Sequence, residues 1–147
     1  MLIDSHCHLN YKGLFEQQGA VLERARAAGI DAFLNISTRQ REWADVIATA
    51  ERESDVWATV GIHPHEADDH ADLGEAALLE ATHHPRVIGI GETGLDYFYD
   101  HSDRQVQQDL FRTHIRVGRK TGLPLIIHTR NAEEDTARIL SEEMEQG

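Results

Sequence analysis

The amino-acid sequence predicts an α/β fold in which helices cover a parallel sheet. Three observations lead to this prediction: apolar segments of strand length alternate with segments of helical periodicity, the alternation occurs five times, and most strand segments end in a residue that can bind metal. Such a series fits either an open doubly wound sheet or part of a TIM-type (βα)8 barrel. The length of 147 residues suits a single domain, residues 1–147.

The first two βα units are predicted from the spacing of apolar residues and from the residues that end helices and strands. A strand is predicted at residues 2–8 (LIDSHCH), and apolar residues then recur at helical spacing over residues 21–28, before Gly29 ends the helix. The second unit has a strand at residues 30–37 (IDAFLNIS) and a helix around residues 43–50. Both units therefore follow the order strand, then helix.

The third and fourth units repeat this order. The strand predicted at residues 56–63 (VWATVGIH) precedes an alanine- and leucine-rich helix around residues 73–81. The strand predicted at residues 87–92 (VIGIGE) precedes a longer helix over residues 106–121, which ends at Gly122.

The fifth unit has a strand at residues 123–128 (LPLIIH) and a helix that continues through residues 139–140. In a barrel, the carboxyl ends of all strands lie on one face and surround a shared pocket. Four of the five predicted strands end in a metal-type ligand, and the full set of strand ends is His8, Ser37, His63, Glu92 and His128.

The histidine pair of the first strand suggests chelation of one ion. Side chains alternate along a strand, so His6 and His8 lie on one side together with Asp4, which we expect to support an imidazole by a hydrogen bond. Cys7 points to the other side and is expected to be a small buried apolar residue. The alternative is a solvated edge strand that carries polar residues without a metal.

The later strand ends carry further candidates. His63 and His65 flank Pro64, which ends the strand, so these imidazoles are expected to face a substrate or, alternatively, to cap a following helix. Glu92 lies among glycines that allow close approach of the backbone, and a carboxylate at a buried strand end needs a partner. A carboxylate can also bridge two metal ions. His128 follows the most apolar strand, where a satisfied core histidine is the alternative.

Composition narrows the classes of function. The formal charge of −12 disfavours a surface-driven nucleic-acid binder, although bound divalent ions would reverse the sign locally. We expect a soluble, cytoplasmic protein that does not cross a membrane, because no apolar run reaches about 20 residues and Cys7 is the single cysteine. The string Gly89, Gly91, Gly94 follows the fourth strand, whereas a dinucleotide fold places this signal after the first, so a nucleotide cofactor is disfavoured.

Four motifs together resemble the TatD-type metal-dependent hydrolases of the amidohydrolase-like barrel class. They are DSHCHLN at residues 4–10, GIHPH at 61–65, GETGLDY at 91–97 and LPLIIHTRNA at 123–132, in family order and at family spacing. The resemblance implies a (βα)8 barrel with two divalent ions (magnesium, manganese or zinc) that cleaves DNA as a deoxyribonuclease.

The resemblance also implies roles for individual residues. It assigns His6 and His8 to the first ion, Glu92 to both ions and His128 to the second. It places His63 and His65 near the scissile phosphate as catalytic and substrate-binding groups, with Arg130 as a phosphate contact. Two rivals stay open: a metal-dependent hydrolase of amide or ester bonds, and a non-catalytic half barrel that acts as an interaction module.

Family members continue with three more βα units, which supply a histidine after strand six and an aspartate after strand eight. We therefore expect this chain to be a truncated product or part of a longer one. Its first and fifth strands are expected to be unpaired edges that invite self-association.

Overall fold

The computed structural model describes residues 1–145, which form a parallel sheet and its covering helices. The strands run in sequence order across the sheet, each hydrogen-bonded to the next: β1 (Ile3–Cys7), β2 (Ala32–Asn35), β3 (Val56–Val60), β4 (Val87–Asp96) and β5 (Leu125–Arg130). The α-helices that follow them are α1 (Gln18–Ala27), α2 (Trp43–Arg52), α3 (Glu75–Ala81), α4 (Arg104–Thr121) and α5 (Glu133–Glu145). The five predicted βα units are thus confirmed.

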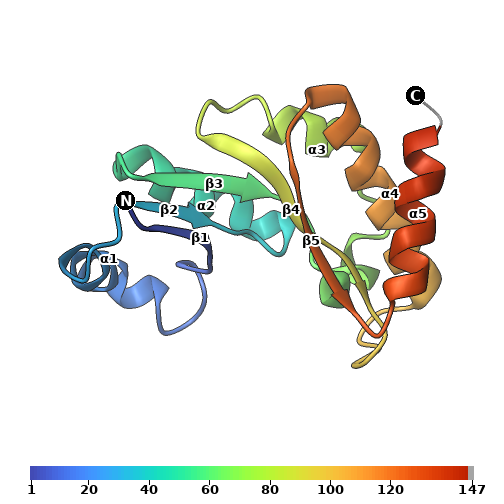
Figure 1. The fold of residues 1–147 in the computed structure, drawn as a ribbon, viewed down its shortest axis with the longest axis horizontal. Helices are drawn as coiled ribbons and strands as arrows, with labels where there is room; N and C mark the ends of the chain where they lie inside the picture. The colour runs from blue at the N-terminus through green and yellow to red at the C-terminus, as the bar shows by residue number, and fades with distance from the viewer. Residues whose placement is uncertain (146–147) are drawn as a thin grey trace.

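The sheet is strongly curled. In Figure 1, β1, β2 and β3 run across the view while β5 runs nearly vertically. Side chains on one face of a flat sheet run parallel, so the tips of residues on β1 and β4 would stay three strand spacings, or about 14 Å, apart. Here His6 Nε2 lies 3.4 Å from Glu92 Oε2. The curl makes this a half barrel, which settles the choice between an open sheet and a barrel.

Several element boundaries differ from the prediction. β3 ends at Val60, and His63 caps a short 3-10 turn at Pro64–Glu66. β4 continues to Asp96, past the predicted end at Glu92, because its glycines let β5 stay close enough to pair along the whole length. β5 is shifted by two residues, so His128 lies within it.

Two apolar clusters hold the helices to the sheet. The larger packs α1, α2 and α3 against the strands through Leu22, Val46 and Leu78, and the smaller packs α4 and α5 against β4 and β5 through Phe111 and Ile139. All five of these side chains are fully buried. The predicted helical periodicities therefore identify the buried faces correctly.

Close backbone contacts explain two glycines of β4. A Cβ on Gly94, whose φ is +136°, would lie 1.9 Å from the carbonyl oxygen of His128. A Cβ on Gly91, whose φ is +148°, would lie 2.5 Å from the carbonyl oxygen of Ile126. The backbone of β5 therefore needs glycine at both positions to approach β4 this closely.

Helix α4 braces the turn that precedes His63. The buried imidazole of His114 donates from Nδ1 to the carbonyl of Leu110 and accepts the backbone N–H of Ile62 at Nε2. Burial lowers the pKa of His114 to about 4, so the ring is neutral at neutral pH. Within residues 1–145, no helix has both the length and the apolar character needed to cross a bilayer.

Candidate metal centre

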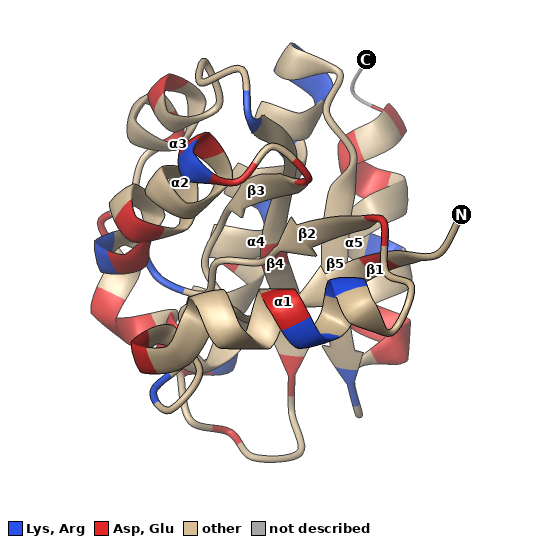
Figure 2. Cartoon of the chain, turned by 90° about the vertical axis from the view of Figure 1, so that its left-hand side faces the viewer, with Lys and Arg blue, Asp and Glu red and all other residues tan. Residues whose placement is uncertain are grey.

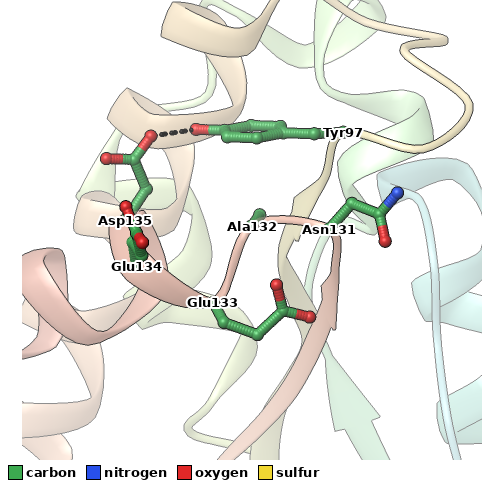
Figure 3. Close-up of a pocket in the computed structure, with 6 residues that line it drawn as sticks. All are labelled: Tyr97, Asn131, Ala132, Glu133, Glu134 and Asp135. Carbon is green, nitrogen blue, oxygen red and sulfur yellow. Dashed lines mark hydrogen bonds between the residues drawn. The ribbon is translucent and has the colours of Figure 1, made fainter.

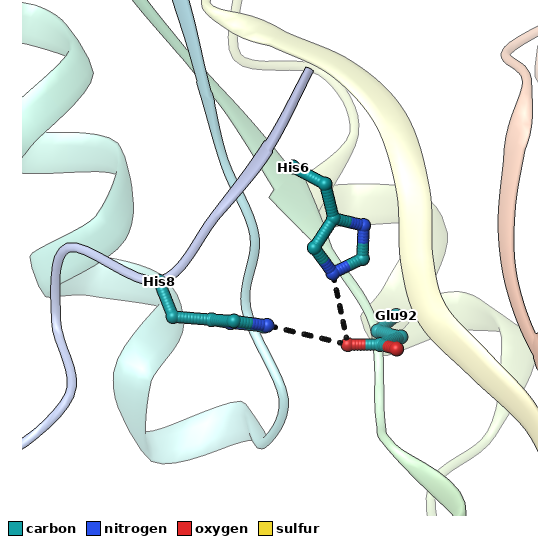
Figure 4. A group of neighbouring side chains, drawn as sticks. All are labelled: His6, His8 and Glu92. Carbon is teal, nitrogen blue, oxygen red and sulfur yellow. Dashed lines mark ion pairs between the residues drawn. The ribbon is translucent and has the colours of Figure 1, made fainter. Parts of the chain in front are cut away.

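Glu92 lies where three histidines converge, two from the end of β1 and the residue after it and one from β5. Its Oε2 atom is 3.4 Å from Nε2 of His6 and 3.5 Å from Nε2 of His8, as Figure 4 shows. Its Oε1 atom is 3.4 Å from Nδ1 of His128. The two oxygens of one carboxylate therefore face two different sets of imidazoles.

The distances fit donor atoms arranged around ions. Four ligands at about 2.1 Å from one ion in a tetrahedron lie about 3.4 Å from one another. Ligand atoms of His6, His8 and Glu92 all lie within 4.8 Å of one another, and so do ligand atoms of His63, Glu92 and His128. The mixed imidazole and carboxylate donors suit divalent transition metals and, with more oxygen ligands, magnesium.

Glu92 is ionised over the working pH range. It is buried, and burial alone would raise its pKa, but the hydrogen bond from His128 and the electrostatic effect of the neighbouring imidazoles of His63, His6 and His8 outweigh burial and hold the pKa at about 2. A buried anion of this kind is costly without a cation or several donors beside it. The centre is therefore anionic and prepared for positive charge.

Backbone contacts orient the first histidine pair. His8 donates from Nδ1 to the carbonyl of Ile36 at 3.1 Å, which leaves the lone pair of Nε2 directed at Glu92. The rings of His6 and His8 lie 5.1 Å apart, so the predicted shared side of β1 is confirmed. The Asp4 carboxylate instead accepts the backbone N–H of His6, and within residues 1–145 it bonds to no imidazole, which corrects the expected support.

Asp96, which was not among the site residues predicted from the sequence, orients the imidazoles of His65 and His128. The carboxylate is fully buried, and its Oδ2 atom lies 2.9 Å from Nε2 of both His65 and His128. Its Oδ1 atom accepts the backbone N–H groups of Phe98 and Tyr99. Because Nε2 of His128 donates to Asp96, the Nδ1 proton that bonds Glu92 is the one that an ion would displace, and its loss leaves a lone pair on the side of Glu92.

A signal for Asp96 was present in the motif GETGLDY. Residues 92, 94 and 96 share one side of a strand, so an aspartate four residues after Glu92 faces the same pocket if the strand continues. Burial alone would raise the pKa of Asp96, but the Tyr99 N–H and the hydrogen bonds from His65 and His128 hold it well below its usual range.

The neutral imidazole of His63 directs its N–H group, and not a lone pair, into the pocket. Its Nδ1 atom accepts the backbone N–H of His65 at 3.1 Å, so the neutral ring carries its proton on Nε2. Burial lowers the pKa of His63 to about 4. The ring lies 4.5 Å from that of His128, between centroids, and offers an N–H donor to the pocket in place of a lone pair. His63 therefore caps the short helical turn that follows it, as one alternative predicted, and it also lies beside the metal-type centre.

Arg130 lies at the end of β5 over an exposed aromatic pair. Its guanidinium carbon is 4.3 Å from the ring centroid of Phe98 and 4.8 Å from that of Tyr99. The ring of Tyr99 also contacts His65, at 5.5 Å between centroids. Arg130 is thus held by cation–π contacts at the rim of the centre, where its charge faces outward.

Cys7 takes no part in either donor set. Its thiol donates to the carbonyl of Leu34 at 3.3 Å and packs against the larger apolar cluster. Burial and the charge of Asp4 raise the pKa of Cys7 to about 12, so the thiol stays protonated. The predicted role as a small apolar residue agrees with these contacts.

A cavity of about 460 Å³ opens beside the end of β5 (Figure 3). The first turn of α5 contributes three carboxylates to its wall, and the hydroxyl of Tyr97 donates to Asp135 at 2.7 Å. The remaining lining residues are Asn131, Ala132, Glu133 and Glu134. A pocket this acidic disfavours anions.

A curled parallel sheet whose strand ends gather imidazoles around a carboxylate defines a TIM-barrel fold with a metal-type centre. The chain belongs to the family described as TatD related DNase, whose model matches residues 3–147. It is similar to two proteins named as uncharacterized metal-dependent hydrolases: YabD of Bacillus subtilis, at 34% identity over 143 residues, and YcfH of Escherichia coli, at 35% over 145 residues.

Solved structures agree with this assignment. The chain matches YJJV, a TatD homolog from Escherichia coli, with a TM-score of 0.90 and 30% identity, over 97% of this chain and 56% of that one. It matches a TatD family hydrolase from Entamoeba histolytica with a TM-score of 0.85 and 25% identity, over 98% of this chain and 55% of that one. The match to YabD likewise covers 97% of this chain and 56% of the relative. The chain thus spans about half the length of these relatives.

Proposed function

We propose that this protein contributes the metal centre of a hydrolase that cleaves phosphodiester bonds in DNA with two divalent ions. The observation that carries the proposal is the orientation of Glu92, with one oxygen toward His6 and His8 and the other toward His128. A carboxylate placed in this way suits a bridge between two ions. The family description and the names of the relatives support hydrolysis, and the description names DNA.

The residues divide into ligands and groups for the substrate. His6, His8 and Glu92 would hold one ion, and Glu92 with His128 would hold the other, with magnesium, manganese and zinc as candidates. The remaining coordination positions go to water or to groups outside the described residues. When bound, such ions supply Lewis-acid polarisation of a phosphoryl oxygen and activation of water.

The chain's own residues prepare the pocket for a phosphate. His63 stays neutral and presents its Nε2–H, which can donate to a phosphoryl or leaving oxygen. His65 is fixed by Asp96 beside it, and Arg130 adds a positive charge at the rim. His63, His65 and Glu92 are therefore the proposed catalytic groups, and the two histidines and Arg130 are the proposed substrate contacts.

Metal titration tests the bridge directly. Calorimetry with Mn²⁺ and Zn²⁺ should give two bound ions per chain for the wild type and a large loss of affinity for both in Glu92→Gln. The exposed His83→Ala is a matched control that should leave binding unchanged. Wild-type affinity in Glu92→Gln would overturn the proposed centre.

A substrate panel tests the reaction. Labelled oligodeoxynucleotides, oligoribonucleotides and small esters are incubated with each metal, and products are separated on gels or followed by absorbance. Metal-dependent cleavage of DNA supports the proposal, whereas turnover of esters without cleavage of DNA would overturn the phosphodiester assignment.

We also propose that the chain acts as one cytoplasmic domain that self-associates through its sheet edges. β1 and β5 are the two outer strands, and Leu2, Ile3 and Ile127 beside them are exposed. Unpaired strand edges with apolar side chains favour pairing between copies. Light scattering on the purified chain should give a mass above 16.6 kDa, and a stable monomer at every concentration would contradict this.

A further inference from the structure

A second cavity, of about 520 Å³, adjoins the centre on the side of β1 and β2. Its six lining residues come from the loop after β1 and from the short turn before α2: Asn10, Tyr11, Lys12, Arg39, Arg41 and Glu42. The ring of Tyr11 stacks on that of His8, with 4.3 Å between centroids and an angle of 10°. One wall of the cavity is thus in contact with a proposed metal ligand.

The cavity concentrates positive charge on an acidic protein. Arg39 pairs with Glu42, at 2.8 Å, and lies 3.7 Å from Glu66. Lys12 and Arg41 are exposed, and neither forms an ion pair within residues 1–145. Figure 2 shows acidic residues on several of the helices, and the net charge of the chain is −12. The two unpaired cations in this cavity therefore make its electrostatic potential more positive than that of the rest of the acidic protein.

Two unsatisfied donors lie in the same wall. In the part of the chain that the structure describes, the buried side-chain nitrogens without a hydrogen-bond partner are Nδ2 of Asn10 and Nε of Arg39. The latter is near Glu42 but is not aligned with it for a hydrogen bond. A buried donor without a partner costs about 1–3 kcal/mol, so an acceptor that reaches it is favoured.

The segment that carries Arg39 and Arg41 is tied to the centre by its backbone. The carbonyl of Ser37 accepts the N–H of Glu92 at 2.9 Å, and the carbonyl of Thr38 accepts the N–H of His63 at 2.8 Å. A group bound in the cavity is thus held in fixed relation to the proposed catalytic groups. The cavity beside Tyr97, in contrast, is lined by carboxylates and would repel an anion.

We propose that this cavity binds a second phosphate of a nucleic-acid substrate, adjacent to the phosphate that is cleaved. Lys12 and Arg41 supply the charge, Asn10 and Arg39 supply N–H donors, and Tyr11 forms the wall shared with the metal centre. The inference rests on the proposed function for the nature of the substrate. It adds residues that distinguish a polynucleotide from a substrate with a single phosphate.

The salt dependence of binding tests this site without requiring turnover. The 147-residue chain is titrated against fluorescein-labelled octathymidylate in EDTA, and anisotropy is followed over a range of KCl concentrations. Each lost phosphate contact lowers the slope of log K against log salt by about 0.7 and lowers affinity about fivefold near 0.1 M salt. Lys12→Ala and Arg41→Ala should each show this loss, and the double variant should show both.

Arg24→Ala is the matched control, because Arg24 is exposed on α1 and has no ion pair within residues 1–145. It removes the same charge outside the cavity and should leave the slope unchanged. An equal loss in Arg24→Ala, an unchanged slope in the double variant, or no wild-type binding would each overturn the site. Thermal melts of every variant identify any change that comes from misfolding.

The two proposals fail in distinguishable ways. If binding depends on Lys12 and Arg41 but no metal produces cleavage, the phosphate site stands and the proposed hydrolysis fails. If DNA is cleaved and the double variant has the wild-type KM for octathymidylate, the hydrolysis stands and the phosphate site fails. With both correct, the double variant raises KM for octathymidylate and leaves turnover of bis(p-nitrophenyl) phosphate unchanged.

Discussion

Nε2 of His128 lies 2.9 Å from Oδ2 of Asp96 at the end of β4, and this hydrogen bond sets the proton of the imidazole. Because Nε2 keeps its proton for Asp96, His128 can give up the proton on Nδ1 to an ion and then presents a lone pair to the side where Glu92 lies. Loss of a carboxylate that is hydrogen-bonded to a metal-binding imidazole commonly lowers metal affinity or activity by about 10–100-fold. Asp96 is thus a positioning residue of the centre.

Asp96→Asn should weaken metal binding by about 10–100-fold, because an amide N–H₂ in place of Oδ2 would face two imidazole N–H groups and favour the other tautomer of His128. Calorimetry with Zn²⁺ and histidine ring nitrogen shifts in NMR spectra measure affinity and tautomer together. Asp100→Asn is the control, because it alters an exposed ion pair between the loop after β4 and Arg104 at the start of α4. An unchanged tautomer in Asp96→Asn would refute this role.

Gly94→Ala should lower the free energy of unfolding by about 3 kcal/mol or more, because its Cβ would meet the carbonyl oxygen of His128 at 1.9 Å. Urea denaturation measures the loss. Gly13→Ala separates the two causes: its φ is +89°, but a Cβ there meets nothing within 4 Å. That control should cost only about 1–2 kcal/mol, the penalty of a left-handed backbone. Equal losses in the two variants would show that the contact with β5 is unimportant.

Stability should fall between pH 6.5 and about pH 4 because of His114, whose pKa burial lowers from 6.5 to about 4. In this window the unfolded chain binds a proton that the folded chain does not, so unfolding becomes easier as pH falls. The full effect is about 3 kcal/mol, and it is complete below pH 4. His114→Gln should reduce stability at pH 7 and flatten this part of the profile in urea titrations. A parallel profile in the variant would contradict the assignment.

Glu143→Gln should destabilise the contact between α4 and α5 by about 2 kcal/mol. The buried carboxylate accepts two hydrogen bonds from Arg116, both at 2.9 Å, and one from Arg112 at 3.1 Å. The bonds from Arg116 are the main reason that its pKa is lowered, so this stabilisation is present at neutral pH and is lost as pH falls below the usual range of a glutamate. Glu142→Gln, at a neighbour whose side chain is 41% exposed, should have a much smaller effect on urea denaturation. Similar losses would contradict the buried role.

The sequence predicts much of this architecture because its signals are local. Helical periodicity identifies the packing faces of α1 and α2, and alternation along β1 places His6 and His8 on one side. Glycines around Glu92 correctly predict a close backbone approach. These features depend on neighbours in sequence, so pattern is sufficient to find them.

Other features depend on contacts between distant segments. β4 was expected to end at Glu92, because the next four residues, with Gly94 among them, lack the apolar alternation of a strand, and Asp96 was not singled out as a result. The bond from Asp4 to the His6 backbone, the tautomers of His8 and His128, and the cavity between two loops follow from the packed structure alone.

The curvature between β1 and β4 carries a consequence for variants far from the centre. His6 and Glu92 meet because the sheet curves across β2 and β3, so the distance between the two side chains depends on the curvature of all the intervening strands. An enlarged side chain that straightens β2 or β3 would move the donor atoms apart although every donor residue was still present in the sequence. Affinity for a cation would then report on mechanical strain in strands that never touch it.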